Sequence, residues 1–218
     1  MAKTVVVLGK GDLAIKVANW FLDSPDHELK AVVPVMPEPG WSASFKAWAD
    51  AKSVPVVESG RYQDLPADED GKYCDLGVSV FYDRIFKAEG IARFGRLINL
   101  HNSPLPKYRG MSPINWALKN GESSHGFTIH EITPGIDDGP IVSQVHYSIF
   151  PEHDEVEHVY ARALRFAWLL FEETMPLLDS IVAREQEHSQ ASYYSSKDSA
   201  LLGDRADWRR TPADIAAQ

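Results

Sequence analysis

The chain has 218 residues, of which 44% are hydrophobic and 11% aromatic, enough for one substantial domain with a small appendage at most. Its 31 acidic and 22 basic residues give a net charge of −9, which argues against general binding to nucleic acid or to an anionic membrane. The single cysteine, Cys74, excludes a disulfide within the chain, and no apolar run approaches the ~20 residues of a membrane span or resembles a signal peptide, so we expect a cytoplasmic protein.

The first hundred residues are predicted to alternate strands with helices. We expect strands at 4–8, 29–35, 54–57, 75–81 and 96–100, and helices at 12–23, 43–52 and 88–94. The predicted strands are apolar or rich in β-branched residues, whereas 12–23 carries apolar residues at helical spacing. This alternation is typical of a mostly parallel α/β sheet with helices on both faces.

The second half adds a different pattern. We expect a helix at 113–119, strands at 126–132 and 141–149, and a long amphipathic helix from 154 to about 184. The two strands alternate polar and apolar residues, which predicts a late antiparallel addition to the sheet. Pro176 is expected to kink or split the long helix. We therefore predict a catalytic domain over 1–184 and a C-terminal extension over 185–218, a small hairpin or docking tail that contains Tyr193-Tyr194, Trp208 and Arg209-Arg210.

Three polar residues stand out as candidate catalytic groups. Asn99 and His101 lie at the end of the 96–100 strand, where open α/β sheets bind ligands, and alternation points them the same way. Asp137 follows in the turn Gly135-Ile-Asp-Asp-Gly139. Asn can donate to an oxyanion, His can move a proton, and a nearby Asp would raise the pKa of the His. The alternatives are a satisfied strand-end histidine and an ordinary turn aspartate.

The segment Gly9-Lys-Gly-Asp-Leu-Ala14 follows the first strand and matches a dinucleotide-binding fingerprint. A tight strand-to-helix turn selects the same glycines, and Glu38, which follows a proline, fits the ribose-binding acid poorly. We favour a structural turn or a substrate-phosphate contact over NAD(P). An NAD(P)-binding oxidoreductase or a nucleotide-sensing module remains the alternative from another class. His153 and His158 are five residues apart, which is not a helical zinc pair, so no metal is expected.

The central block resembles the 10-formyltetrahydrofolate-dependent formyltransferases, which act on methionyl-tRNA, glycinamide ribonucleotide or amino sugars. The resemblance covers about Asp75 to Asp179, and more loosely the first 60 residues. It is carried by Ile98-Asn-Leu-His101, Ser103-Pro-Leu-Pro-Lys-Tyr-Arg-Gly110, Pro113-Ile-Asn-Trp-Ala-Leu118, Gly121-Glu, Gly126-Phe-Thr-Ile-His130 and Gly135-Ile-Asp-Asp-Gly-Pro-Ile141.

The resemblance implies a Rossmann-like fold, 10-formyltetrahydrofolate as formyl donor, and Asn99, His101 and Asp137 as the catalytic trio. It also implies two segments that hold the pterin, one through its backbone and one as a closing loop. These donor-binding residues are Arg84, Ile85 and Phe86 in the first segment and Thr133, Gly135, Ile136 and Asp138 in the second.

The acceptor amine is expected to belong to a nucleotide-linked 4-amino-deoxy sugar. The chain is much shorter than a methionyl-tRNA formyltransferase, and its first loop lacks the phosphate loop of the glycinamide ribonucleotide enzymes; these two classes are the alternatives. Residues 108–116 and 191–194 look closer to the amino-sugar enzymes. Candidate substrate contacts are Lys10, Arg109 and Trp116, although Trp116 is also expected as a buried helix residue. The long helix and the aromatic tail suggest a homodimer.

Overall fold

The computed structural model describes residues 2–203, and its contacts define two compact units. The first unit comprises the chain up to Leu100 together with Glu131–Gly135, and the second comprises His101–His130 and the chain from Ile136 onward. Within residues 2–203 no helix has the length and apolar character needed to cross a membrane.

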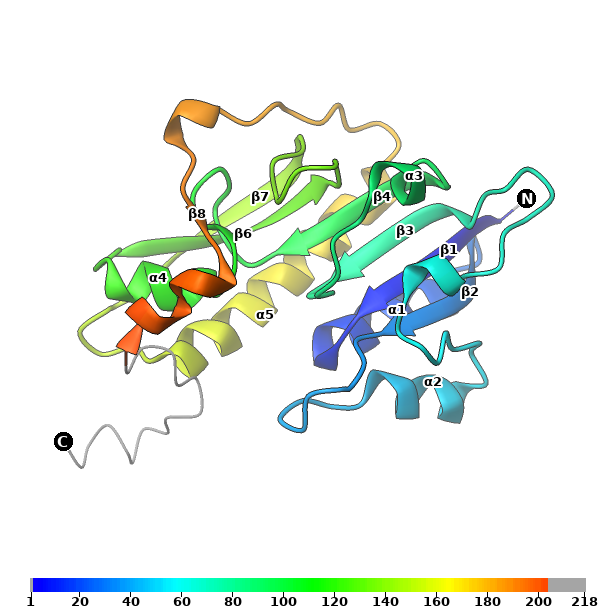
Figure 1. Ribbon diagram of the computed structural model, residues 1–218, viewed down its shortest axis with the longest axis horizontal. Helices are drawn as coiled ribbons and strands as arrows, with labels where there is room; N and C mark the ends of the chain where they lie inside the picture. The colour runs from blue at the N-terminus through cyan, green and yellow to red at the C-terminus, as the bar shows by residue number, and fades with distance from the viewer. Residues whose placement is uncertain (1, 204–218) are drawn as a thin grey trace. The chain divides into compact units, whose positions relative to one another are not determined.

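The first unit alternates strands and helices, as predicted. Its elements are β1 (Lys3–Gly9), α1 (Gly11–Asp23), β2 (His27–Pro34), α2 (Phe45–Lys52), the 3-10 turn η1 (Tyr62–Asp64), β3 (Cys74–Val80), α3 (Ala88–Ile91) and β4 (Phe94–His101). All neighbouring strands of this unit pair in parallel, in the order β2-β1-β3-β4 (Figure 1). The register places Val7 of β1 between Val32 of β2 and Val78 of β3.

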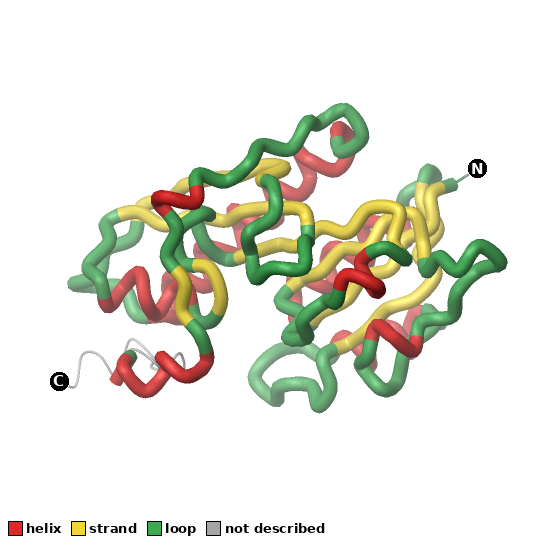
Figure 2. The backbone as a smooth tube through the Cα atoms, turned by 45° about the horizontal axis from the view of Figure 1, so that its top comes forward, coloured by secondary structure: helices red, strands yellow, loops and turns green. Residues whose placement is uncertain are grey.

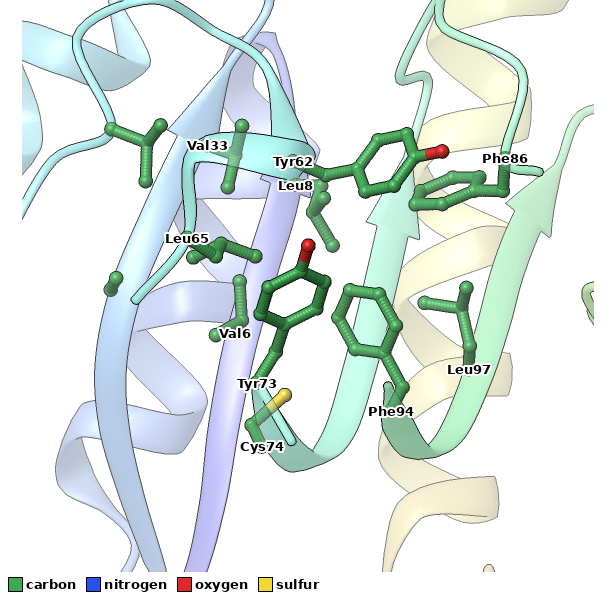
Figure 3. Close-up of a cluster of buried hydrophobic side chains, with 12 residues drawn as sticks. Val6, Leu8, Val33, Tyr62, Leu65, Tyr73, Cys74, Phe86, Phe94 and Leu97 are labelled. Carbon is green, nitrogen blue, oxygen red and sulfur yellow. The ribbon is translucent and has the colours of Figure 1, made fainter. Parts of the chain in front are cut away.

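The core of this unit forms because β1 is buried on both faces, as a central parallel strand must be. Val6 and Leu8 point into an aromatic cluster with Tyr62, Phe86 and Phe94 (Figure 3). The alternate residues of β1 are equally buried and face the other side of the sheet, and α1, which contacts β1 and β2, buries its own apolar stripe. Both sheet faces are thereby removed from water.

Cys74 belongs to the same cluster, where burial raises the pKa of its thiol to about 12. A thiol with this pKa stays protonated at neutral pH. Cys74 therefore acts as a packing residue.

The glycine motif after β1 is required by the turn itself. A Cβ on Gly9 would lie 2.0 Å from the carbonyl oxygen of Val80, and Gly11 has φ +73°. Glu38 is committed to another role, because its carboxylate accepts hydrogen bonds from the backbone N–H groups of Phe45 and Lys46 at 2.6 and 3.0 Å. Glu38 thus caps the start of α2 and is not available as a ribose-binding acid.

The second unit contains the later elements of the chain. These are β5 (Arg109–Gly110), α4 (Pro113–Lys119), β6 (Ser124–Glu131), β7 (Ile141–Ser148), α5 (Val156–Thr174), the 3-10 turns η2 (Met175–Leu177), η3 (His188–Gln190) and η4 (Ser196–Leu201), and β8 (Tyr193–Tyr194). Strands β6 and β7 pair antiparallel, β5 and β8 pair in parallel, and α5 packs against β7 and α4. The parallel strands of the first unit and the antiparallel pair β6–β7 of the second confirm a mostly parallel α/β fold with a late antiparallel pair.

Three predicted elements were wrong in type or length. Residues 54–57 form only an isolated bridge between Val56 and Val32. The helix expected over 88–94 ends at Ile91, because β4 already begins at Phe94. The long helix ends at Thr174 rather than near 184, since Pro176 has no N–H to donate to the carbonyl of the preceding turn.

The chain between α5 and β8 is mostly loop (Figure 2). Its described part is tied to the second unit by the pairing of β8 with β5 and by backbone hydrogen bonds between Ile141 and Arg184 at 2.7 and 2.8 Å. Trp208, Arg209 and Arg210 lie outside the described residues. The domain boundary after residue 184 stays a prediction.

His125 is the most deeply buried titratable group of β6. Its Nε2 donates to the carbonyl of Asn102 at 2.9 Å, and its Nδ1 has no hydrogen-bond partner within residues 2–203. Burial lowers its pKa to about 4, against the opposing hydrogen bond to Asn102. His125 is therefore neutral in the folded chain at pH values at which the unfolded chain is protonated.

This difference predicts a pH dependence of stability. Between about pH 6.5 and 4 the unfolded state binds the extra proton, so the free energy of unfolding falls with falling pH, by about 3 kcal/mol from His125 alone. A His125→Gln variant, which keeps an N–H donor but does not titrate, should lose this part of the slope in urea unfolding measured at pH 7 and pH 4. The exposed His153, in the turn before α5, is the control, and His153→Gln should keep the wild-type slope. Equal slopes in wild type and H125Q would contradict the assignment.

Candidate active site

His101 ends β4 and is almost fully buried, with 8% of its surface exposed. Its Nε2 lies 3.0 Å from the carbonyl oxygen of Tyr108, which can only accept a hydrogen bond, so Nε2 carries a proton. The other nitrogen, Nδ1, faces Oδ2 of Asp137 at 3.6 Å. The structure therefore brings together two of the three predicted catalytic residues, 36 positions apart in the sequence.

The carboxylate of Asp137 has three polar neighbours, one backbone N–H and two imidazole rings. Oδ2 accepts a hydrogen bond from the backbone N–H of Gly110 at 2.8 Å. Oδ1 lies 3.5 Å from Nε2 of His130, and Oδ2 faces His101. The two imidazole rings stand nearly perpendicular, at 84°, with centroids 6.2 Å apart.

These contacts set the protonation states of the pair. Burial lowers the pKa of His101 and outweighs the attraction of Asp137, which raises it. As expected, Asp137 by itself raises the His101 pKa, but the net shift of that pKa is downward because burial has the larger effect. Burial raises the pKa of Asp137, but His101, His130 and the Gly110 N–H together bring it well below its usual range. The result is a neutral imidazole beside an ionised carboxylate.

This arrangement can accept a proton. Uptake at Nδ1 of His101 creates an imidazolium whose two N–H groups face two acceptors, the Tyr108 carbonyl and the Asp137 carboxylate. The 3.6 Å separation exceeds that of an ordinary N–H···O hydrogen bond, and catalytic hydrogen bonds are often this long before substrate binds. The pair suits general acid–base chemistry.

His130 is a site residue to which the sequence analysis assigned no role. It lies on β6, is 2% exposed, and contacts Asp137. Strand alternation places His130 on the same side of β6 as the buried Thr128. A buried imidazole on that side is expected to have a hydrogen-bonding partner. The identity of that partner depends on the fold of the 135–139 loop.

The loop that carries Asp137 is held in an unusual shape. Asp137 has φ +51°, a left-handed conformation that costs a non-glycine residue about 1 kcal/mol. Gln186 holds the loop: its Nε2 donates to the carbonyl oxygens of Asp137 at 2.8 Å and Gly139 at 2.7 Å. No local sequence signal marks Gln186, because its contacts lie more than 45 positions away.

Gly110, which donates to Asp137, is also constrained by its neighbours. It has φ +88°, and a Cβ there would lie 2.2 Å from the carbonyl oxygen of Tyr194 on β8. Only glycine allows β8 to approach β5 this closely. The backbone donor for Asp137 and the docking of the tail thus depend on the same residue.

The remaining predicted residues divide between the two units. Asn99 belongs to the first unit and lies two positions before His101 on β4, so alternation points both side chains to the same face. In the predicted pterin segment, Arg84 and Ile85 are exposed, whereas Phe86 packs on Tyr62 with ring centroids 4.7 Å apart. Of the closing loop, Thr133 and Gly135 belong to the first unit, and Ile136 and Asp138 to the second. The donor-binding roles of these residues stay predictions.

The three candidate substrate contacts have different surroundings. Lys10 precedes α1 and uses its backbone N–H to bind the Val80 carbonyl at 3.2 Å. Trp116 on α4 is 5% exposed and stacks on Tyr194 at 4.0 Å, as expected of a buried helix residue. The guanidinium of Arg109 donates to Oε1 of Gln186 through Nε and Nη2, at 3.1 and 2.6 Å. Their substrate roles remain predictions.

Metal-ligating side chains do not gather within residues 2–203: no group of three or more His, Cys, Asp or Glu is placed to hold an ion. Of the two histidines considered from the sequence, His158 is engaged at the start of α5, where its Nδ1 accepts a hydrogen bond from the Glu155 backbone at 2.9 Å.

The His101–Asp137 contact makes a prediction about titration. Asp137→Asn removes the attraction that offsets burial, so the pKa of His101 should fall further below its ordinary value. Titration of ¹⁵N-labelled histidines by NMR measures this shift directly. Glu173→Gln, which removes an exposed carboxylate from α5, should leave His101 unchanged. A His101 pKa that is the same in D137N and wild type would show that the Asp137 charge does not act on His101.

Comparison with known proteins supports the same chemistry. A family model described as formyl transferase matches residues 47–174. Methionyl-tRNA formyltransferase from Pseudothermotoga lettingae is 38% identical over 144 residues, which are 64% of this chain and 45% of that protein. The chain spans less than half the length of the curated relatives it matches.

Two solved structures are similar over nearly the whole chain. An N-formyltransferase from Helicobacter canadensis, in complex with folinic acid and dTDP-3-aminofucose, is 25% identical with a TM-score of 0.77, covering 91% of this chain and 72% of its own. The formyltransferase PseJ from Anoxybacillus kamchatkensis, in complex with UDP-4,6-dideoxy-4-formamido-L-AltNAc and tetrahydrofolate, is 28% identical with a TM-score of 0.63, covering 94% and 93%. Because the family model matches more than half of the chain, including Asn99, His101 and Asp137, the chain belongs to the formyl transferase family.

Proposed function

We propose that this chain transfers a formyl group from 10-formyltetrahydrofolate to the primary amine of a nucleotide-linked amino sugar. The observation that carries the proposal is the buried His101–Asp137 pair, a neutral base beside an ionised carboxylate, inside the segment that the formyl transferase model matches. Membership of the family supports the reaction, and the geometry of the pair supports His101 as the group that transfers the proton.

The chemistry follows from the groups. The bound donor supplies an electrophilic formyl carbon attached to N10. As the substrate amine attacks this carbon, a C–N bond forms and negative charge develops on the formyl oxygen. Nδ1 of His101 takes the proton that the amine loses and returns it to N10 as the original C–N bond breaks. Asp137 stabilises the intervening imidazolium, and the Asn99 amide donates to the formyl oxygen, which is worth about 3 kcal/mol for a well-aimed donor.

The residues assigned to the donor have a chemistry that suits a pterin. A pterin is flat, with polar edges and an apolar face. Ile85 is 66% exposed, so the segment from Arg84 to Phe86 offers apolar surface together with backbone N–H and C=O groups. Backbone groups are well suited to pair with the polar edge of such a ring.

The acceptor is the finer part of the proposal. The two solved neighbours described above carry nucleotide-linked sugars in their complexes and align with more than nine-tenths of this chain. The methionyl-tRNA relative is the competing class, but a net charge of −9 is unfavourable for holding a tRNA backbone. An amino sugar therefore fits this chain better than tRNA does.

The test is a panel of acceptors. The chain is incubated with 10-formyltetrahydrofolate and, separately, with dTDP- and UDP-linked 3- and 4-amino sugars, glycinamide ribonucleotide and methionyl-tRNA, and the mass gain of one formyl group is measured. We expect gain on an amino sugar. A mass gain only on methionyl-tRNA or glycinamide ribonucleotide would overturn the acceptor assignment. If no acceptor in the panel gains mass, the proposed reaction itself is wrong.

The roles of the site residues are tested on the best acceptor. Asn99→Ala should lower kcat by about 10²–10³-fold, the cost of removing one oxyanion donor. His101→Ala should lower kcat by about 10²–10⁴-fold, the contribution of general acid–base catalysis. Thermal unfolding serves as the folding control. Near-normal turnover by a folded H101A variant would refute the proton-transfer role.

We also propose a cytoplasmic homodimer. Large apolar side chains are exposed on α5 and just after it, with Leu169 54% and Leu177 58% exposed. Burying such a surface in a second copy would remove apolar area from water. Light scattering should give twice the chain mass at micromolar concentration, and Leu169→Glu should shift that mass toward the monomer. A monomeric mass for the wild type would exclude the dimer.

A further inference from the structure

We propose that Gln186, which lies in the loop after α5, is a positioning residue that sets the geometry and the proton affinity of the His101–Asp137 pair. The inference rests on the proposed function for its kinetic consequence, but its effect on His101 titration stands independently of turnover.

Gln186 uses all of its hydrogen-bonding capacity at this one place. It is 5% exposed. Its two N–H groups donate to the carbonyls of Asp137 and Gly139, and its oxygen accepts both Nε and Nη2 of Arg109. A buried amide that makes four hydrogen bonds is rigid, and here the amide ties the Asp137 loop to β5.

Strand β5 is the element that shapes both members of the pair. Tyr108 directly precedes β5, and its carbonyl accepts a hydrogen bond from Nε2 of His101. Gly110 of β5 donates its backbone N–H to the carboxylate of Asp137. Through Arg109, which lies between them, Gln186 holds the same three-residue segment that provides these two groups. Gln186 therefore acts on the acceptor of His101 and on the donor to Asp137 at once.

The rest of the tail fixes the far side of β5. The hydroxyl of Ser192 accepts the Tyr108 N–H at 2.8 Å, and its carbonyl accepts the Arg109 N–H at 2.9 Å. The carbonyl of Tyr194 accepts the Met111 N–H at 2.8 Å. With these bonds in place, β5 cannot follow the Asp137 loop if that loop moves, so the Gln186 bonds decide where Asp137 lies relative to His101.

Loss of these bonds has a defined electrostatic result. Asp137 is held in a left-handed conformation, and Gln186 binds the carbonyl of that same residue. Once released, the loop relaxes toward ordinary backbone angles and carries the carboxylate away from Nδ1 of His101. The attraction that offsets the burial of His101 weakens, so the His101 pKa falls and the ring is a poorer base.

Two substitutions separate the contacts. Gln186→Leu removes all four hydrogen bonds. Gln186→Glu keeps the acceptor for Arg109 but, when ionised, cannot donate to the carbonyls of Asp137 and Gly139. Both variants should lower kcat by about 10–100-fold, because a small misplacement of the reacting groups affects the transition state more than binding. Gln186→Glu, which still holds the Arg109 guanidinium, should leave KM for the acceptor nearly unchanged. In Gln186→Leu, which adds no charge, histidine NMR should show a lowered His101 pKa. Gln186→Glu adds a negative charge that by itself raises this pKa, so that variant is judged by kcat.

Gln144→Leu is the matched control. Gln144 is a partly buried glutamine of β7 whose Nε2 donates to the Leu105 carbonyl and the Thr128 hydroxyl, each at 2.8 Å, and it has no bond to the Asp137 loop. The Gln144→Leu variant should lower the melting temperature as Gln186→Leu does, without shifting the His101 pKa.

A Gln186→Leu variant that loses thermal stability but keeps the wild-type His101 pKa would overturn the proposal, since the role would then be structural only. If wild type transfers no formyl group but the NMR shift appears, the proposed function fails and the positioning role stands. If Gln186→Leu does not fold, the kcat of Gln186→Glu decides, and a wild-type kcat in that variant overturns the proposal.

Discussion

The candidate site depends on one buried negative charge, the carboxylate of Asp137. An ionised carboxylate taken out of water is destabilised by several kcal/mol unless other groups replace its hydration. Here the Gly110 N–H donates to Oδ2, Nε2 of His130 lies near Oδ1, and a proton taken up by His101 adds a positive charge, so the Asp137 pKa is lowered despite burial. The need to place these groups around one carboxylate accounts for the left-handed backbone at Asp137, whereas the glycine at position 110 is required by the close approach of β8.

Comparison of two buried histidines shows what this charge accomplishes. His125 and His101 both lose water on folding, and burial lowers the pKa of each. His125 binds only a neutral backbone carbonyl, so nothing nearby stabilises its imidazolium strongly, whereas His101 faces a carboxylate that does. The same side chain is therefore a core residue at one position and a candidate proton acceptor at the other, and the difference lies in the neighbours.

Local patterns predicted the parts of the structure that depend on local chemistry. The parallel strands, the position of His101 at the end of β4, and the late antiparallel pair all follow from hydrophobic periodicity and turn residues. Strand 54–57 failed because a short apolar run does not show whether a neighbouring strand has room to pair with it. Residues His130 and Gln186 gained no role because their partner, Asp137, is defined only by tertiary structure.

The proposed reacting groups and the residues that hold them in place come from different stretches of the chain. Asn99, His101 and Asp137 lie inside the segment that the family model matches, which ends at 174, whereas Gln186 and Ser192 follow it. The reacting groups must present particular atoms to a substrate, so their identity is restricted. The support contacts carbonyls and N–H groups of the backbone, together with the Arg109 guanidinium, and many donor arrangements can satisfy such groups. Different side chains could therefore hold the Asp137 loop and β5 in this fold, provided that they keep the proposed proton-transfer pair in the same geometry.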